Sequence, residues 1–312
     1  MGGVINGALA QNDIIMRFKI LFLVMMVIGV ASCKSVDAPM DVTVGEKVAA
    51  TVNVTIPEDS RAASGEGFDL STLEQEDSEY EMRFILEVYY GNERSSRQVK
   101  YVSVPTAAFD IRLVPERDYR LAVWADIVAK VDNRDVADDY DRYYETSSSL
   151  KSVSIIESEW RCDALDCDAY TGNADIKNFS SASPINVLLK RPFAMLRVVA
   201  TDYSSVVGNV NKLSVTYNDV YTAFNACSGE VVENSNKEHE KFVISSEYND
   251  VEGETTLFTD YIFAPESDTP LNFSFSAYDG EDNLIKQNNF GSGVTIKRNT
   301  LTTIKGALFS QN

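Results

Sequence analysis

The sequence is poor in histidine and in basic side chains. Its 312 residues include one histidine, and 47 acidic side chains outnumber 28 basic ones, which gives a net charge of −19. One imidazole is too few for a metal site built from several histidines. A strongly acidic chain also lacks the basic stripe that binds nucleic acid. We therefore expect no nucleic acid among the partners and no metal held by histidines.

Sequence motifs of the common enzyme classes are absent as well. The chain contains no Gly-Xaa-Ser-Xaa-Gly elbow, no phosphate-binding glycine loop and no His-Glu-Xaa-Xaa-His motif. His239 lies in the charged stretch 236–241, where a surface position is far more common than a triad base. We therefore expect a protein that is not an enzyme, with no catalytic residue and no cofactor.

Long apolar runs are also missing, and the one notable run lies near the N-terminus. Ile20–Val30 is uncharged, too short to span a membrane and of the right length for a signal-peptide core. It ends in Val30-Ala31-Ser32-Cys33, which resembles the bacterial lipobox, in which the cysteine is acylated. We expect residues 1–32 to be a signal peptide, with translation starting at Met16. Cys33 is then the lipidation site and the anchor to the outer membrane.

The rest of the chain has the alternation of apolar and polar residues that is typical of β-strands. Residues 33–46 are polar and predict a lipidated linker. Apolar side chains then occupy every second position of a first strand: Val48, Ala50, Val52, Val54 and Ile56. Similar strands recur about every ten residues with turn residues between them, and no long stretch has a helical period. The sequence therefore predicts an all-β fold of the sandwich type.

The length and one proline indicate two domains. Lys190-Arg191-Pro192 is a natural boundary because proline interrupts a strand. We expect an N-terminal β-sandwich over residues 47–190 and a C-terminal β-sandwich over residues 191–312. Residues 58–79, acidic and rich in serine and glycine, predict a long exposed loop. Trp124 lies in an apolar strand and is expected in the core.

The remaining cysteines and the acidic clusters leave alternatives open. Cys162 and Cys167 are near enough in sequence to form a disulfide, which would leave Cys227 over. Three unpaired buried thiols are an equal alternative, and the spacing makes a poor zinc site. Five aspartates within residues 132–141 suggest a calcium loop, but the EF-hand spacing is missing. A solvated acidic loop is the preferred interpretation, and we predict no metal site.

Four segments together resemble the fimbrillin-like lipoproteins of Bacteroidales, whose relatives include subunits of type V pili. They are the lipobox at Cys33, residues 109–126, residues 191–199 and residues 297–309. The resemblance implies two transthyretin-like β-sandwiches in tandem. It also implies a lipid-anchored surface protein that acts in pilus assembly or cell adhesion.

The resemblance further implies a route of assembly. In the pilus relatives a protease cuts after an arginine that follows the first strand, and a strand of a neighbouring subunit fills the groove left behind. Here residues 48–56 are the predicted leaving strand, and Arg61 is the predicted site of proteolytic processing. The expected partners are other fimbrial subunits and ligands on host or bacterial surfaces. Residues 301–309 resemble a strand of the second domain itself, which favours a tip or accessory subunit.

An alternative function is a glycan-binding surface lipoprotein that is not part of a pilus. Trp160 and the tyrosines within residues 140–144 would form its stacking platform.

Overall fold

The computed structural model describes residues 45–62, 67–131, 141–159, 164–180, 183–206, 208–241 and 253–310. Cys33, with the whole predicted leader, lies outside these ranges, and so do Cys162, Trp160 and Tyr140. None of the helices in the described ranges is long and apolar enough to cross a membrane. The segment Gly45–Asn312 forms one compact unit.

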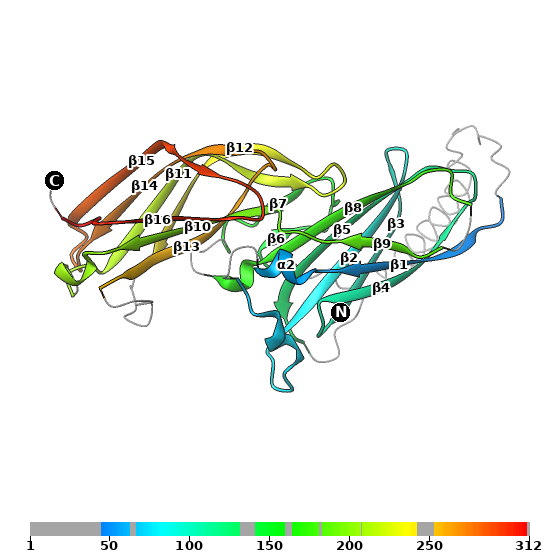
Figure 1. Cartoon of the computed structure of the whole chain (residues 1–312), viewed down its shortest axis with the longest axis horizontal. Helices are drawn as coiled ribbons and strands as arrows, with labels where there is room; N and C mark the ends of the chain where they lie inside the picture. The colour runs from blue at the N-terminus through cyan, green and yellow to red at the C-terminus, as the bar shows by residue number, and fades with distance from the viewer. Residues whose placement is uncertain are drawn as a thin grey trace, which may run out of the picture. The chain divides into compact units, whose positions relative to one another are not determined.

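The first β-sandwich is built from one sheet of three strands and one of four (Figure 1). Its strands are β1 (Val48–Thr55), β2 (Tyr80–Tyr90), β3 (Glu93–Val102), β4 (Thr106–Leu113), β5 (Tyr119–Ala129), β8 (Ala169–Ile176) and β9 (Ile185–Leu188). The small sheet has the order β4-β1-β9 and the large sheet the order β3-β2-β5-β8. Apolar side chains of both sheets meet in one core, as expected for a sandwich.

The second sandwich follows directly along the chain. Its strands are β10 (Phe193–Ala200), β11 (Lys212–Asn225), β12 (Glu230–Lys241), β13 (Thr255–Phe263), β14 (Thr269–Tyr278), β15 (Leu284–Ile296) and β16 (Leu301–Gly306). One group has the order β13-β10-β16 and the other the order β15-β14-β11-β12. A single pair, Tyr221 with Phe263, joins the two groups. The second core lies between them.

The two sandwiches repeat one pairing scheme. β1 pairs antiparallel with β4 and parallel with β9, and β10 pairs antiparallel with β13 and parallel with β16. The order β3-β2-β5-β8 likewise matches β12-β11-β14-β15. The structure thus confirms the predicted all-β fold with tandem sandwiches. The division of domains at residue 190 stays a prediction.

Short elements fill the connections between these strands. They are the helix α2 (Glu58–Ala62), the 3-10 turns η1 (Leu70–Glu74), η2 (Leu165–Cys167) and η3 (Tyr203–Ser205), and the strands β6 (Tyr144–Glu145) and β7 (Val153–Ile155). β7 pairs with β6 and with β11, although it precedes residue 190. The structure therefore attaches part of the N-terminal half to a sheet of the second sandwich.

A third core cluster contains residues from both halves of the chain. Trp124, fully buried as predicted, lies in it together with Phe193 and Phe263. The rings of Phe193 and Phe263 stack with centroids 4.8 Å apart. Because this cluster covers the outer face of β2 and β5, both strands are buried on their two faces. A strand of this kind loses the simple alternation that a half-exposed strand has.

Burial on both faces also encloses charged side chains of β2. The Arg83 guanidinium binds both carboxylate oxygens of Asp126, at 2.8 and 2.6 Å, and one of Asp141, at 2.9 Å. The Glu87 carboxylate accepts hydrogen bonds from Arg94 and Arg97. Such pairing is the condition under which a charge is tolerated in a core.

Two sequence-based expectations about connecting segments were wrong or incomplete. Residues 58–79 are not simply an exposed loop, because α2 and η1 lie within them and Leu70 and Leu73 are buried against the first core. The polar strand β12 was not expected at all. It forms because it pairs with β11 along almost its whole length, and backbone pairing does not require apolar side chains.

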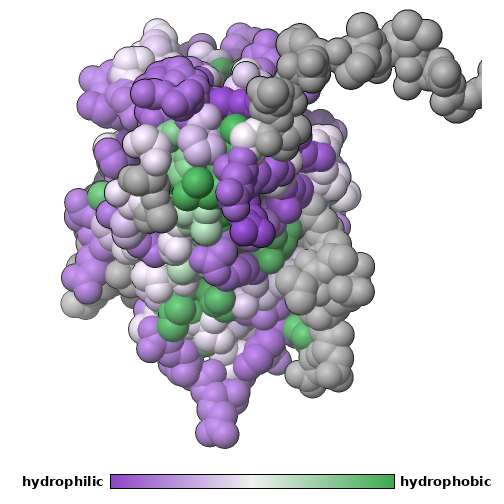
Figure 2. Space-filling view, turned by 90° about the vertical axis from the view of Figure 1, so that its right-hand side faces the viewer, coloured by the Kyte–Doolittle hydropathy of each residue, from purple (hydrophilic) through white to green (hydrophobic). Residues whose placement is uncertain are grey.

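The face of the molecule in Figure 2 is largely hydrophilic, with hydrophobic residues in patches between. Single large apolar side chains are also exposed, and Leu188 of β9 is 64% exposed. Isolated residues of this kind are normal on protein surfaces.

The third cluster gives a test of how the protein is stabilised. We expect Phe193→Ala to lower the free energy of unfolding by about 3–5 kcal/mol, because it leaves a cavity among stacked rings. Leu188→Ala, at an exposed position, is the control and should change it by less than about 0.5 kcal/mol. Urea denaturation measures both, and equal effects would contradict the assignment of Phe193 to the core.

Candidate functional site

The predicted leaving strand is the central strand of its sheet. β1 pairs antiparallel with β4 over all eight residues, and Val52–Thr55 pair parallel with Ile185–Leu188 of β9. Alternate side chains of β1, and Ile56 directly after it, point into the first core and are at most 3% exposed: Ala50, Val52, Val54 and Ile56. Each large one contributes about 1.5–3 kcal/mol by burial. Removing β1 would therefore open an apolar groove between two unpaired strand edges.

The predicted processing site follows β1 closely. Arg61 lies in the five-residue helix α2, and the backbone around it is helical. A protease that reads an extended backbone must unwind this short helix, which a helix of one turn permits at little cost. The residue before it, Ser60, is 3% exposed and therefore belongs to the interior.

An ion pair far along the chain holds this segment. Arg191 and Asp168 are almost completely buried and form a bidentate pair, with Nε and Nη2 of the arginine each 2.7 Å from a carboxylate oxygen. The second terminal nitrogen of Arg191, Nη1, donates to the carbonyl oxygen of Ser60 at 3.0 Å. Arg191, which the sequence analysis noted only as a domain boundary, thus holds the chain next to Arg61.

The same ion pair is closed from the other side by Gly67. A Cβ atom at this glycine would lie 2.3 Å from Nη2 of Arg191 and 3.0 Å from Oδ2 of Asp168, so only glycine fits without displacement. The backbone thus lies close to the pair at Gly67, after the predicted cut, and is hydrogen-bonded to it at Ser60, before the cut.

Tyr170 completes the cluster. Its hydroxyl group donates to Oδ2 of Asp168 at 2.9 Å. Burial, with the charge of Asp168 as a further cause, raises the pKa of Tyr170 well above its usual value, so the phenol stays protonated. Burial alone would lower the pKa of Arg191, but Asp168 outweighs it and the pKa is raised. Arg191 therefore stays charged and Tyr170 stays neutral, and the cluster serves to fix structure.

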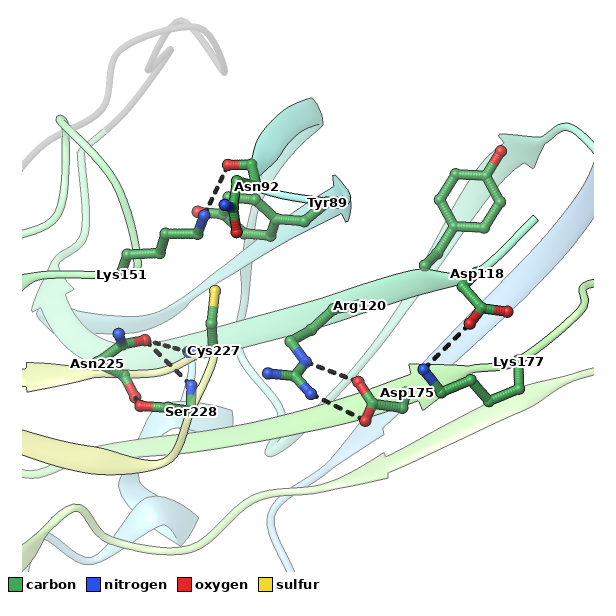
Figure 3. A pocket seen from close by; sticks show the side chains of 12 residues that line it. Tyr89, Asn92, Asp118, Arg120, Lys151, Asp175, Lys177, Asn225, Cys227 and Ser228 are labelled. Atoms are coloured by element: carbon green, nitrogen blue, oxygen red, sulfur yellow. Dashed lines mark hydrogen bonds and ion pairs between the residues drawn. The ribbon is translucent and has the colours of Figure 1, made fainter.

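A second candidate site is a cavity of about 460 Å³ that is lined by residues of both sandwiches (Figure 3). Two of its three cations are paired within the cavity, Arg120 with Asp175 at 2.6 Å and Lys177 with Asp118 at 3.2 Å, and Lys151 donates to the carbonyl of Asn92. Burial raises the pKa of its thiol, Cys227, to about 11, so the sulfur stays protonated at neutral pH and is a poor nucleophile. The cavity thus offers compensated charges and an inert thiol.

The cysteine predictions are tested only in part. Cys227 is a free and buried thiol. Cys167 is buried as well, but its predicted disulfide partner Cys162 lies outside the described residues, so that pairing stays a prediction. Within the ranges that the structure describes, no group of three or more candidate ligands gathers into a metal site.

The structure corrects the part of the proposed glycan platform that it describes, whereas Trp160 and Tyr140 lie outside the described residues. Tyr143 and Tyr144 are buried, and Tyr144 packs against Trp124 and Phe193 in the third core cluster. A sugar cannot stack on a ring whose faces are covered by other side chains. The many acidic residues around this segment obscure any alternation of apolar and polar residues. The sequence therefore did not reveal that Tyr143 and Tyr144 turn inward.

Comparison with known families assigns the chain to one of them. Residues 41–312 match a protein family whose description is "Family of unknown function (DUF6562)". The chain belongs to the DUF6562 family. No curated protein matches this DUF6562 chain.

Solved structures similar to this DUF6562 chain include two fimbrial proteins. One is a fimbrial assembly protein from Parabacteroides distasonis, with 11% identity, coverage of 83% of this chain and 90% of the other, and a TM-score of 0.44. The other is the fimbrial anchor protein Mfa2 from Porphyromonas gingivalis, with 9% identity, coverage of 78% and 83%, and a TM-score of 0.43.

The ion pair next to α2 can be tested by mutation. Asp168→Asn leaves the Arg191 cation buried without its counter-charge, which should cost about 3–5 kcal/mol of stability. It should also speed cleavage between residues 58 and 67, followed by limited proteolysis and mass spectrometry. Asp175→Asn, whose ion pair with Arg120 is about half exposed, is the control and should cost less than about 1 kcal/mol. Unchanged proteolysis in Asp168→Asn would show that the pair does not hold the segment.

Proposed function

We propose that this DUF6562 protein is a lipid-anchored protein of the cell surface that acts in pilus assembly or cell adhesion. Cleavage at Arg61 frees β1 covalently from the body, and a strand of another fimbrial subunit then replaces it. Cys33 carries the lipid. The protein has two domains, which are the two sandwiches divided at residue 190. The protein acts as an anchored accessory or tip subunit and binds its partners through backbone pairing.

The observation that supports this proposal best is the position of β1. It is the first strand after the linker, it fills the groove between β4 and β9, and the predicted cut lies directly behind it. Extended peptides bind by pairing with a free strand edge, and alternate side chains enter pockets of the groove. A vacated β1 groove would offer two such edges at once.

The geometry of the groove defines the strand that it accepts. An incoming strand that runs in the direction of β1 restores antiparallel pairing with β4 and parallel pairing with β9. Its inward positions must be apolar, and the one at Ala50 must be small, because close-packed cores tolerate little added volume. The partner is therefore a segment with strict alternation of branched apolar and polar residues.

Cleavage also separates the lipid from the body, but only covalently. The anchored fragment would end at Arg61 and would still contain β1, which stays bound through its backbone hydrogen bonds and four buried side chains. Exchange of the strand, rather than the cut itself, is then the event that releases the body from the membrane.

The predicted cut is tested on the exported protein with an arginine-specific protease. We expect a new N-terminus at Ala62, found by mass spectrometry, in the native protein and in the control variant Arg112→Ala, in which an exposed arginine of β4 is removed. Arg61→Ala should abolish this product. Cleavage at other arginines while the bond after Arg61 stays intact would contradict the proposed processing at Arg61.

Strand exchange is tested on the cleaved protein bound to lipid vesicles. An excess of a synthetic peptide with the sequence of residues 46–57 should release the body into the supernatant, because it competes for the β1 groove. The same peptide with aspartate in place of Val52 and Val54 cannot enter the apolar groove and should release none. Equal release by the two peptides, or release by cleavage alone, would contradict exchange in this groove.

A further inference from the structure

The turn between β15 and β16 gathers positive charge in a strongly acidic protein. Lys297, Arg298, Asn299 and Thr300 form this turn, and with Lys190 and Glu266 they line a cavity of about 370 Å³. Three cations thus meet one carboxylate, whereas the whole chain has a net charge of −19. This turn is also the start of the C-terminal segment 297–309 that the sequence analysis singled out, and the proposed strand exchange does not involve it.

The cations of this cavity are not neutralised by neighbours. Among the described residues, no carboxylate lies within 4.0 Å of a charged nitrogen of Lys190, Lys297 or Arg298. The Nε atom of Arg298 is buried and has no hydrogen-bond partner within the part of the chain that the structure describes. A buried donor without an acceptor destabilises the protein, and a bound acceptor would relieve this cost.

The direction of the pKa shift of Arg298 agrees with the absence of a carboxylate bound to its guanidinium. Burial lowers the pKa of its guanidinium, and the attraction of Glu266 and Glu230 does not offset this effect. The pKa of each buried arginine, Arg83 and Arg191, is shifted in the opposite direction, because Asp126 and Asp168 bind them directly. Arg298 stands apart because its counter-charge is missing from the nearest positions.

The turn is held rigidly in this form. The Arg298 guanidinium lies over the ring of Phe224, 5.0 Å from its centroid, and the backbone N–H of Arg298 donates to the carbonyl of Pro265 at 3.0 Å. Asn299 has a positive φ of 58°, and its N–H donates to the carbonyl of Phe193 at 2.6 Å. The Thr300 hydroxyl donates to the carbonyl of Lys297. A site fixed in advance loses little entropy when a ligand binds.

In the cavity of Figure 3, by contrast, each cationic side chain already has a partner within the protein. There, Arg120 and Lys177 each bind an aspartate, and Lys151 donates to the carbonyl of Asn92 at 2.6 Å. A ligand would have to displace those partners. At Arg298 it would have none to displace.

We propose that the cavity at Lys297–Thr300 binds a carboxylate group of an acidic peptide segment on a partner protein. A planar guanidinium fits a planar carboxylate, and the two lysines add positive charge. The Oδ1 atom of Asn299 is buried and also lacks a hydrogen-bond partner among the described residues, so it can accept a backbone N–H of the same peptide. The described lining contains no aromatic ring, which argues against a sugar as the ligand.

This binding site is independent of strand exchange. Its turn, Lys297–Thr300, lies in the second sandwich, and Lys190 pairs with Thr171 of β8 rather than with β1. A failure of cleavage at Arg61 would leave the proposal intact, and a failure here would leave strand exchange intact.

The experiment measures calorimetric binding of two capped peptides to the full-length protein in detergent. One is acetyl-Ser-Asp-Glu-Asp-Ser-amide, and the other has Asn and Gln in place of the acidic residues. We expect binding of the acidic peptide alone, weakened at least about tenfold in Arg298→Gln, because a hydrogen bond to a charged group is lost. Arg112→Gln removes an equal charge from an exposed position of β4 and should change the affinity less than twofold.

A second variant guards against misfolding of Arg298→Gln. Lys297 is exposed, so Lys297→Gln keeps the fold and should weaken binding several-fold, more strongly at low salt than at high salt. Equal binding of the two peptides, no binding of either, or full affinity in both cavity variants would overturn the proposal. Binding of glucuronate in place of the acidic peptide would overturn the peptide assignment and identify an acidic sugar as the ligand.

Discussion

The burial of one strand between two others is the constraint on which the first half of this protein depends. β1 is the only element that pairs with both β4 and β9 in the described sheet, and its inward side chains lie in the centre of the first core. The sandwich is complete only while that position is filled. Any strand with the same alternation satisfies the same hydrogen bonds and the same core, so the fold specifies a pattern of side chains rather than one particular segment.

Two kinds of charged side chain occur in the protein: those that are paired and fix the fold, and those that have no carboxylate partner among the described residues. Arg83, Glu87 and Arg191 are buried and paired, and Arg83 and Arg191 join segments that lie far apart in the sequence. Because removing one partner of such a pair leaves an uncompensated charge, these clusters hold connections in a single arrangement. Arg298 differs from them, since it is held by a ring and by backbone contacts rather than by a carboxylate.

The repeated pairing scheme gives the two sandwiches equivalent positions with different surroundings. β1 and β10 have the same partners in their sheets, but β10 begins with Phe193 inside the third core cluster, whereas β1 follows the polar linker. β10 is therefore tied to the rest of the protein by aromatic packing on its second face. Removing β1 would therefore disturb the first core alone, whereas removing β10 would disturb the second core and the third cluster.

The sequence by itself determined the fold class, the order of most strands and the burial of Trp124, because period-two alternation reports whether each residue faces a core. It also located β1 and the segment around Arg61. Only the tertiary structure decided that β2 and β5 are buried on both faces, that Tyr143 and Tyr144 turn inward, and that the polar strand β12 exists. The link between Arg191 and Ser60 and the grouping of Lys190 with Arg298 also required the structure. The physical reason is that a local pattern encodes a residue's own exposure, whereas its partner is chosen by how strands far apart in the chain come to pair.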